Sequence, residues 1–273
     1  LAFTRYPGDR NRTSPFAFTG NRFEFRAVGS SQSVSGPLVA MNTILADSLN
    51  WIAEKLDAAL ISGQDQSASV ITVLKELMEL HGNVIFGGDG YSSEWHTAAV
   101  EERGLKNIPT TADALPAFKD EAVKALFKST GVLSPVELES RYEVYSEQYI
   151  LAIEVEAKLV VDLATTSIYP AAAGYLSELT STIASSSSAG IELDNSLAKS
   201  IAADANAMMK SVNVLAAAIK VDEFPSVEAH MKYCADTITS LMDDVRSYAD
   251  TLEGSVANTA WPLPKYSEML FIK

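Results

Sequence analysis

The sequence predicts a mainly α-helical fold, in which a short N-terminal β-hairpin precedes a long antiparallel helical bundle. Two observations carry this prediction: aromatic and turn-forming residues dominate residues 1–36, and apolar residues recur at helical spacing through most of residues 37–273. With 47% hydrophobic and 21% charged residues, the composition is that of an ordinary globular protein and excludes disorder for most of the chain. We therefore divide the chain into a β segment, residues 1–36, and a helical region with an ordered tail, residues 37–273.

The β-hairpin is expected at residues 16–26. Phe16-Ala17-Phe18 and Arg22-Phe23-Glu24-Phe25-Arg26 alternate aromatic with other residues, as strands do. Thr19-Gly20-Asn21 lies between them and suits a hairpin connection.

Helices are expected over residues 38–61 and 70–80. In the first, apolar residues recur close to the 3.6-residue period of an α-helix. Glycines follow both runs and supply stop signals. A further helix is expected over residues 93–103, and a loop with prolines and threonines over residues 104–116.

The second half of the chain is expected to be almost entirely helical. Ser134-Pro135-Val136-Glu137 combines an N-cap serine, a proline in the first turn and a capping-box glutamate, so a helix should begin there. Pro170 should kink or interrupt this helix near Ser167. A serine-rich turn is expected at residues 185–190. Two more helices are expected over about residues 192–220 and 226–253.

Charge is distributed unevenly along the chain. The formal net charge is −14, yet residues 1–26 hold five arginines, no lysine and two carboxylates, a net charge of +3. Arginine is preferred where a planar fork binds carboxylate or phosphate, so this segment predicts a local anion site. The acidic remainder argues against a protein that coats nucleic acid or anionic lipid.

The composition also bears on location. No apolar run approaches the roughly 18 residues that a membrane span needs, and the first residues contain no apolar signal segment. The single cysteine, Cys234, excludes a disulfide framework and suits a reducing compartment. We expect a cytoplasmic protein, or one of the plastid stroma if the source is an alga. Because the chain does not begin with Met, we expect a fragment or a processed product.

The sharpest candidate site is Arg22-x-Glu24-x-Arg26. On a strand these three side chains share one face, with a carboxylate between two guanidinium groups. One interpretation is a surface ion-pair ladder, which stabilises little. The other is a preorganised site, in which Glu24 binds a divalent cation and the arginines bind the phosphates that it neutralises. The pattern alone leaves both open.

Further residues around this motif resemble a known family. Asn11-Arg12-Thr13-Ser14, followed ten residues after Arg12 by the Arg-x-Glu-x-Arg motif, resembles the end of the glutamine synthetase catalytic domain. The run from Thr13 to Ser31, the long helical region and the ending Trp261-Pro-Leu-Pro-Lys-Tyr-Ser-Glu-Met-Leu-Phe271 look like the type III class. The resemblance implies ligation of ammonia to glutamate through γ-glutamyl phosphate, with ATP and Mg²⁺, or Mn²⁺ in its place. Residues 1–36 would then be the end of the catalytic domain.

The resemblance also implies roles for four residues. Glu24 would bind magnesium beside the nucleotide phosphates, and Arg22 would contact the nucleotide. Arg26 would contact the transferred phosphoryl group, and Arg12 would bind glutamate or γ-glutamyl phosphate. These roles agree with phosphoryl transfer as positioning plus neutralisation of charge.

The sequence departs from the common classes of the family at two places. Ala17 stands where a second arginine is usual, and Ala27-Val28-Gly29 replaces the usual proline and aspartate. The ammonium-site strand, the main metal-ligand strands and the glycine-rich nucleotide region of the family precede this motif. The chain alone is therefore expected to be inactive.

Glutamine synthetases form rings, so the resemblance implies a homo-oligomeric ring, a dodecamer, with no nucleic-acid or membrane partner. The bundle and the tail would serve assembly, with Trp261, Tyr266 and Phe271 as anchors. Two alternatives stay open. One is a module that binds single-stranded nucleic acid through the arginines and aromatic residues of residues 1–26. The other is a non-catalytic helical assembly protein.

Other motifs predict structural roles. Gly87-Gly88-Asp89-Gly90 lacks the Gly-Lys-Ser/Thr ending of a phosphate loop, so a turn is expected. His81, His96 and His230 form no pair with metal-ligand spacing. Cys234 has no histidine nearby in the sequence and is expected to be buried.

Overall fold

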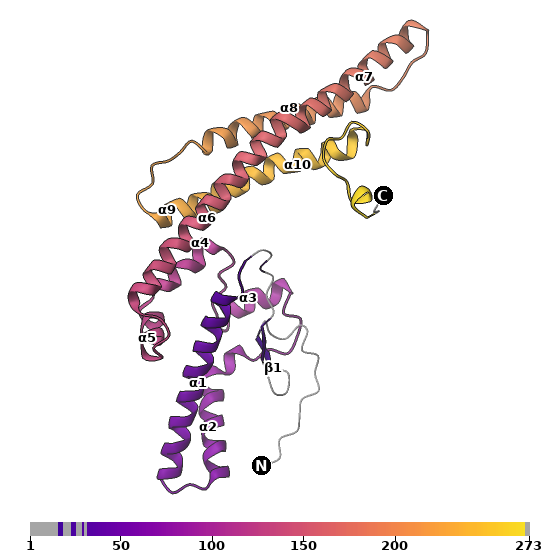
Figure 1. Cartoon of the computed structure of the whole chain (residues 1–273). Helices are drawn as coiled ribbons and strands as arrows, with labels where there is room; N and C mark the ends of the chain where they lie inside the picture. The colour runs from indigo at the N-terminus through magenta and orange to yellow at the C-terminus, as the bar shows by residue number, and fades with distance from the viewer. Residues whose placement is uncertain (1–15, 19–22, 26–28, 30–31, 271–273) are drawn as a thin grey trace. The chain divides into compact units, whose positions relative to one another are not determined.

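The computed structural model describes residues 16–18, 23–25, 29 and 32–270 (Figure 1), and it is mainly helical, as predicted. The chain divides into two compact units. Unit 1 comprises Leu1–Pro109 and Ala117–Arg141, and unit 2 comprises Thr110–Pro116 and Tyr142–Lys273. The boundary expected between residues 36 and 37 falls within unit 1.

Two short strands lie in unit 1. β1 (Phe16–Phe18) and β2 (Phe23–Phe25) pair antiparallel, and Ala17 lies opposite Glu24 in the register. The connection expected at residues 19–21 lies outside the described residues.

A pair of long helices follows, α1 (Ser35–Ile61) and α2 (Gln66–His81). α1 begins three residues before the expected start, because a proline in the first turn removes an N–H that has no helical partner anyway. α2 begins four residues early because Asp65 caps it, accepting a hydrogen bond of 2.9 Å from Ala68 N–H. A hydrogen-bonded ion pair of 2.6 Å between Lys55 and Glu76 links the two helices.

The remainder of unit 1 contains shorter helices. A 3₁₀ turn η1 (Gly82–Val84) and α3 (Ser93–Glu101) come first, and α5 (Glu121–Ser129) follows after residue 117. Sequence periodicity assigned no helix to the region of α5. Its buried Phe127 packs with Leu133 and Leu138 in a small core. Asp120 caps the start of α5 by accepting a hydrogen bond of 2.8 Å from Ala122 N–H.

Unit 2 is built from long helices that pack on one core. These are α6 (Pro135–Leu163), which begins in unit 1, α7 (Tyr169–Ser188), α8 (Ser196–Ala218), α9 (Val227–Tyr233) and α10 (Thr239–Ser255). α8 runs back along α7 and packs against both α7 and α10 (Figure 1). The fully buried residues of this core include Ala157, Ala172, Ile201, Met208, Leu215 and Leu252.

Two π-helical turns join consecutive helices of unit 2. One, Ala164–Ile168, connects α6 to α7, and the other, Cys234–Ile238, connects α9 to α10. The first lies directly before Pro170, so the predicted interruption near Ser167 is confirmed. The chain widens by one residue there, with Tyr169 N–H donating to Ala164 O, and then continues as a helix.

Two expected loops are partly helical. Within the expected loop over residues 104–116 lie α4 (Thr111–Ala114) and the start of a 3₁₀ turn η2 (Leu115–Lys119). The expected serine-rich turn is wrong for its first four residues, because α7 continues to Ser188. Ser188 Oγ donates to Ala184 O one turn earlier at 2.9 Å, which lets the serine remain in the helix.

The C-terminal tail packs on unit 2 itself. Trp261, which the sequence suggested as an assembly anchor, is 8% exposed and belongs to the core of its own unit. Lys265 Nζ donates to Asn258 Oδ1 at 2.6 Å and to Glu253 O at 3.2 Å, which fastens the tail to the end of α10. The short helix α11 (Tyr266–Met269) follows. The side chain of Tyr266 and all of Phe271 lie outside the described residues.

Within residues 16–18, 23–25, 29 and 32–270, no helix is both long enough and apolar enough to cross a membrane.

Candidate functional site

Of the four residues that the sequence places in an active site, Glu24 lies in the described part of the chain. It occupies the middle of β2 and is partly buried. Directly opposite residues of an antiparallel pair share a face, so Glu24 and Ala17 lie on the same face. Arg12, Arg22 and Arg26 lie outside the described residues.

Glu24 does not by itself form a metal site. Among the residues that the structure describes, no group of three or more His, Cys, Asp or Glu side chains is arranged to hold a metal ion. Mg²⁺, however, is bound in many enzymes by one or two carboxylates, with phosphate oxygens and water completing the octahedron. One partly buried carboxylate on a strand fits such a shared site.

The glycine-rich segment Gly87–Gly90 forms an irregular loop, consistent with the expected turn. Tyr91 N–H donates to Asp89 Oδ1 at 3.0 Å, and His96 Nε2 lies 3.2 Å from Gly90 O. A Cβ atom at Gly88 would lie 2.6 Å from the end of the Phe86 ring, so a larger residue at this position would displace that ring. The hydrogen bond to Asp89 shapes the turn, and the Phe86 ring packs closely against Gly88.

An arginine fastens this loop. Arg103 Nη1 donates to Ile85 O at 2.7 Å, and its guanidinium carbon lies 5.0 Å from the centre of the Trp95 ring. Trp95 in turn stacks on Phe86, with 3.7 Å between ring centres. Asn83 closes the arrangement by donating to Arg103 O at 3.0 Å. Sequence analysis did not find this cluster, because its members lie up to 20 residues apart and are joined by spatial contact rather than by periodicity.

The histidines and the cysteine have structural surroundings. His81 ends α2 and His96 contacts the glycine-rich loop, whereas His230 stacks on Phe224 in unit 2. Cys234 is buried, as expected. Burial, with a smaller effect of the nearby Glu154 carboxylate, raises the pKa of the Cys234 thiol to about 11. Because the thiolate is the reactive form, Cys234 is a poor nucleophile.

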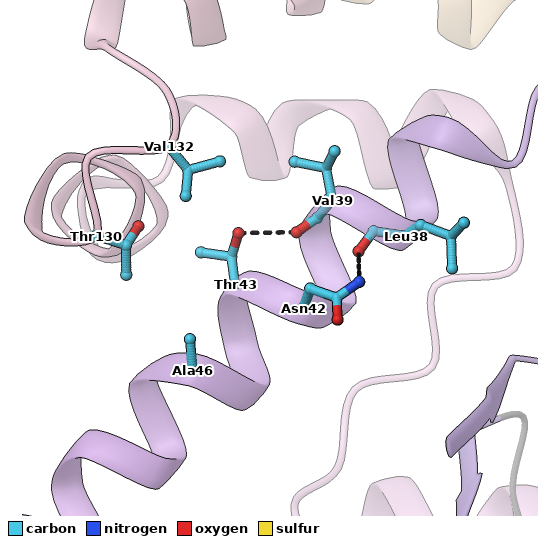
Figure 2. Close-up of a pocket in the computed structure, with 7 residues that line it drawn as sticks. All are labelled: Leu38, Val39, Asn42, Thr43, Ala46, Thr130 and Val132. Atoms are coloured by element: carbon cyan, nitrogen blue, oxygen red, sulfur yellow. Dashed lines mark hydrogen bonds between the residues drawn. The ribbon is translucent and has the colours of Figure 1, made fainter. Parts of the chain in front are cut away.

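A hollow of about 380 Å³ lies in unit 1, between the first turns of α1 and the segment after α5 (Figure 2). Its polar side chains are used locally: Asn42 Nδ2 donates to Leu38 O at 2.8 Å, and Thr43 Oγ1 donates to Val39 O at 2.7 Å. The lining contains no charged residue. Such a hollow lacks the groups that would bind glutamate or a nucleotide. Its lining residues are Leu38, Val39, Asn42, Thr43, Ala46, Thr130 and Val132.

Comparison with known families gives the class of protein. Residues 69–187 match the family described as the glutamine synthetase C-terminal domain. This match covers nearly all of α2 to α7, so the helical part of the chain resembles the C-terminal region of glutamine synthetases.

Individual relatives extend the match to almost the whole chain. The chain is 38% identical over 274 residues to the type-3 glutamine synthetase of Dictyostelium discoideum, covering 97% of this chain and 37% of that protein. It is 33% identical over 277 residues to a glutamine synthetase of Bacteroides fragilis, covering 97% of this chain and 37% of that protein. A glutamine synthetase of Butyrivibrio fibrisolvens is 31% identical over 279 residues, and the match covers 99% of this chain and 39% of that protein.

The resemblance to glutamine synthetases of the type III class is confirmed, and the chain matches the C-terminal part of these relatives. It spans somewhat more than a third of the length of these relatives.

Proposed function

We propose that the chain is part of a glutamine synthetase, which ligates ammonia to glutamate through γ-glutamyl phosphate at the expense of ATP. The observation that carries this proposal is the carboxylate of Glu24 at the centre of β2, within the motif Arg22-x-Glu24-x-Arg26 of a chain from this family. The single buried thiol suits the cytoplasm, where we place the enzyme.

Each site residue has a proposed role that follows from its chemistry. Glu24 binds a divalent cation, Mg²⁺ or Mn²⁺, and this cation neutralises the phosphate charge during transfer. Arg22 binds the nucleotide phosphates, and Arg26 binds the transferred phosphoryl group, since a guanidinium matches three-oxygen anions with two parallel hydrogen bonds. Arg12 binds the carboxylate of glutamate or the acyl phosphate formed from it. Residues 1–36 would then form the end of the catalytic domain.

The test is Glu24→Gln in the complete enzyme. This change keeps the shape of the side chain and removes the charge, so we expect normal folding, a higher magnesium requirement and sharply lower turnover. Glu121→Gln is the matched control, because Glu121 is an exposed glutamate of unit 1 in a simple ion pair with Lys124. Wild-type turnover and magnesium dependence in Glu24→Gln would overturn the metal assignment.

The arginines are tested by Arg12→Lys and Arg26→Lys. A lysine keeps the charge and loses the planar fork, so kcat should fall more than KM rises for ATP or glutamate. A change in KM alone at both positions would mean that these arginines only bind the ground state.

We also propose that the enzyme assembles as a homo-oligomeric ring, a dodecamer by resemblance to the family. A stripe of apolar side chains on the exposed side of α6 supports this proposal, because apolar residues spaced by seven and four positions line one helical face. The stripe comprises Val144, Leu151, Val155 and Leu159, which are 44%, 60%, 46% and 52% exposed.

The stripe is tested by Leu151→Glu, with Glu156→Gln as control, because Glu156 is exposed on the same helix and lies outside the stripe. If the stripe lies in the assembly, light scattering will show a smaller particle for Leu151→Glu and an unchanged one for Glu156→Gln. An unchanged mass for both variants would exclude this face of α6 from the assembly contacts.

A further inference from the structure

The glycine-rich loop of unit 1 contains the single Asp-Gly dipeptide of the chain, Asp89-Gly90. An aspartate followed by glycine closes easily into a five-membered cyclic imide, in which the backbone nitrogen of the glycine attacks the aspartate carboxyl group. Glycine favours this reaction because it has no Cβ beside the attacking nitrogen and leaves the backbone free to rotate. The dipeptide therefore has a covalent chemistry of its own.

The surroundings of Asp89 leave room for this reaction. Asp89 is exposed and lies between the 3₁₀ turn η1 and α3, outside any helix or strand. Gly88 precedes it and Gly90 follows it, so the backbone is permissive on both sides. An aspartate inside a helix has no such freedom, because the N–H of the next residue is bonded to a carbonyl of the preceding turn.

The hydrogen bonds of the loop bring the reacting groups together. Tyr91 N–H donates to Asp89 Oδ1 at 3.0 Å, and Ser92 N–H donates to Asp89 O at 3.3 Å. These two bonds form an Asx-turn inside a backbone turn, which curls the Asp89 side chain over the peptide groups that follow it. The carboxyl carbon is thus held on the side of the Gly90 nitrogen.

The attacking nitrogen itself is free. Gly90 N–H donates no hydrogen bond to any residue that the structure describes. The other end of Gly90 is held, since His96 Nε2 of α3 lies 3.2 Å from Gly90 O. Attack by the Gly90 nitrogen therefore breaks no hydrogen bond of the fold.

We propose that Asp89-Gly90 is a site of spontaneous isomerisation to isoaspartate. The Gly90 nitrogen forms a bond to Cγ of Asp89 and loses its proton, a C–O bond of the carboxyl group breaks, and one water molecule leaves. Water then adds to either carbonyl of the imide and breaks its bond to nitrogen. Opening at Cγ restores aspartate, and opening at the backbone carbonyl carbon gives isoaspartate, with no net change in composition.

Isomerisation changes the loop. The chain then runs through Cγ of residue 89, which lengthens the backbone by one methylene group and moves the carboxylate onto the main-chain carbon. The turn to Ser92 can no longer close as it does now. Ser92 Oγ accepts from Trp95 N–H at 3.2 Å and caps α3, so the change is expected to reach the start of that helix.

The first test follows the water molecule that is lost and regained. The complete protein is kept for several weeks at pH 6 and 37 °C in water enriched in ¹⁸O, and is then digested with trypsin in ordinary water. The peptide of residues 76–103 has Asp89 as its single aspartate. We expect this peptide to gain ¹⁸O and to separate into two forms of equal mass, one of which resists a protease that cuts before aspartate.

Asp47-Ser48 is the control in the same digest. Asp47 is also exposed and is followed by a small residue, but it lies inside α1, where the next N–H is used by the helix. The peptide that contains Asp47 should stay unlabelled. Equal labelling of Asp47 and Asp89 would overturn the proposal, because the loop would then contribute nothing to the reaction.

Two loop variants test the route. Gly90→Ala keeps the carboxyl group and adds a Cβ beside the attacking nitrogen, so labelling at Asp89 should fall about tenfold. Gly87→Ala is the matched control in the same loop, because a Cβ there meets no atom within 4 Å and position 87 is not next to the carboxyl group. It should label as fast as wild type.

Two results would overturn the proposal. One is a wild-type protein that gains no ¹⁸O at Asp89 while its urea-unfolded chain does, because the fold would then protect the dipeptide. The other is equal labelling of Gly90→Ala and Gly87→Ala, because the Gly90 nitrogen would then not be the attacking group. The test reads residue 89 directly and does not depend on the proposed function.

Discussion

The two units bury their apolar residues in different ways. In unit 2, α7, α8 and α10 bury their apolar residues in one continuous core. In unit 1, the long pair α1 and α2 buries Val73 and the small polar residues Thr43 and Ser69, while larger side chains stay exposed. Leu49 is 55% exposed, Leu74 is 41% exposed, and Met78 is 56% exposed. The comparison teaches that helical periodicity creates an apolar face, whereas a third layer of helices is what turns that face into a core.

The largest effect is expected when one leucine in each unit is replaced by alanine. Leu252 of α10 is 0% exposed, so Leu252→Ala should destabilise unit 2 by about 2–5 kcal/mol through lost burial and a cavity. Leu74→Ala on the exposed side of α2 should cost less than about 1 kcal/mol. Hydrogen exchange of α10 and α2 in the complete enzyme measures both free energies of opening. An equal loss of stability in both variants would contradict the comparison, because α2 would then be covered as fully as α10.

A thiol probe gives a second test. Cys234 is 1% exposed and its pKa is raised to about 11 by burial and by the Glu154 carboxylate. At pH 8 a thiol reagent should therefore react with it at least about 100-fold more slowly than with the urea-unfolded chain. The contrasting probe is Met78→Cys in a Cys234→Ser background, which should react quickly because position 78 is exposed. Similar rates at the two positions would contradict the difference between the units.

The sequence predicted the long elements well because each carries its signal locally. The start of α6 is the clearest case: Glu137 Oε2 accepts from Ser134 N–H at 2.8 Å and from Ser134 Oγ at 2.8 Å, as the capping-box pattern predicts. Pro170 likewise marks the π-helical turn directly before it.

Among the short helices, α3 was predicted, whereas α4 and α5 were not. α4 depends on the burial of Ala112 and Leu115 and on Lys232, which lies more than a hundred residues later. Four residues are too few to show a helical period. In the candidate site, alternation predicted a strand with Arg22, Glu24 and Arg26 on one face, and the structure describes Glu24 at the middle of the strand β2. The roles of Arg12, Arg22 and Arg26 stay predictions, since they depend on what the folded chain brings beside Glu24.

The capping box allows a smaller test with a pH signature. Ser134→Ala should lower the stability of the first turns of α6 by about 1 kcal/mol, which is typical of a lost N-cap. The hydrogen bonds from the Ser134 N–H and hydroxyl lower the pKa of Glu137 from its ordinary value of 4.5. This contribution is therefore present above pH 4.5 and is lost as the pH falls through the lowered pKa.

Hydrogen exchange at residues 136–140 between pH 7 and pH 3 measures this effect. The wild type should lose protection over the acidic part of the range, and Ser134→Ala should lose less, since its cap is already broken. Parallel pH profiles for the two proteins would show that the Glu137 carboxylate does not stabilise the start of α6.

The smallest expected effect compares two buried serines, one in each unit. Ser69 of α2 and Ser146 of α6 are both 0% exposed. Ser69 Oγ donates to Asp65 O at 2.9 Å, whereas Ser146 Oγ makes no hydrogen bond to any residue that the structure describes. A buried hydroxyl without a partner costs free energy, so Ser146→Ala should stabilise unit 2 by up to about 1 kcal/mol. Ser69→Ala should destabilise unit 1 by about 0.5 kcal/mol, because a lost hydrogen bond outweighs the better helix propensity of alanine. Urea unfolding midpoints show whether each variant is stabilised or destabilised. A shift in the same direction for both would mean that burial, and not hydrogen bonding, determines what a helix serine contributes to the stability of this protein.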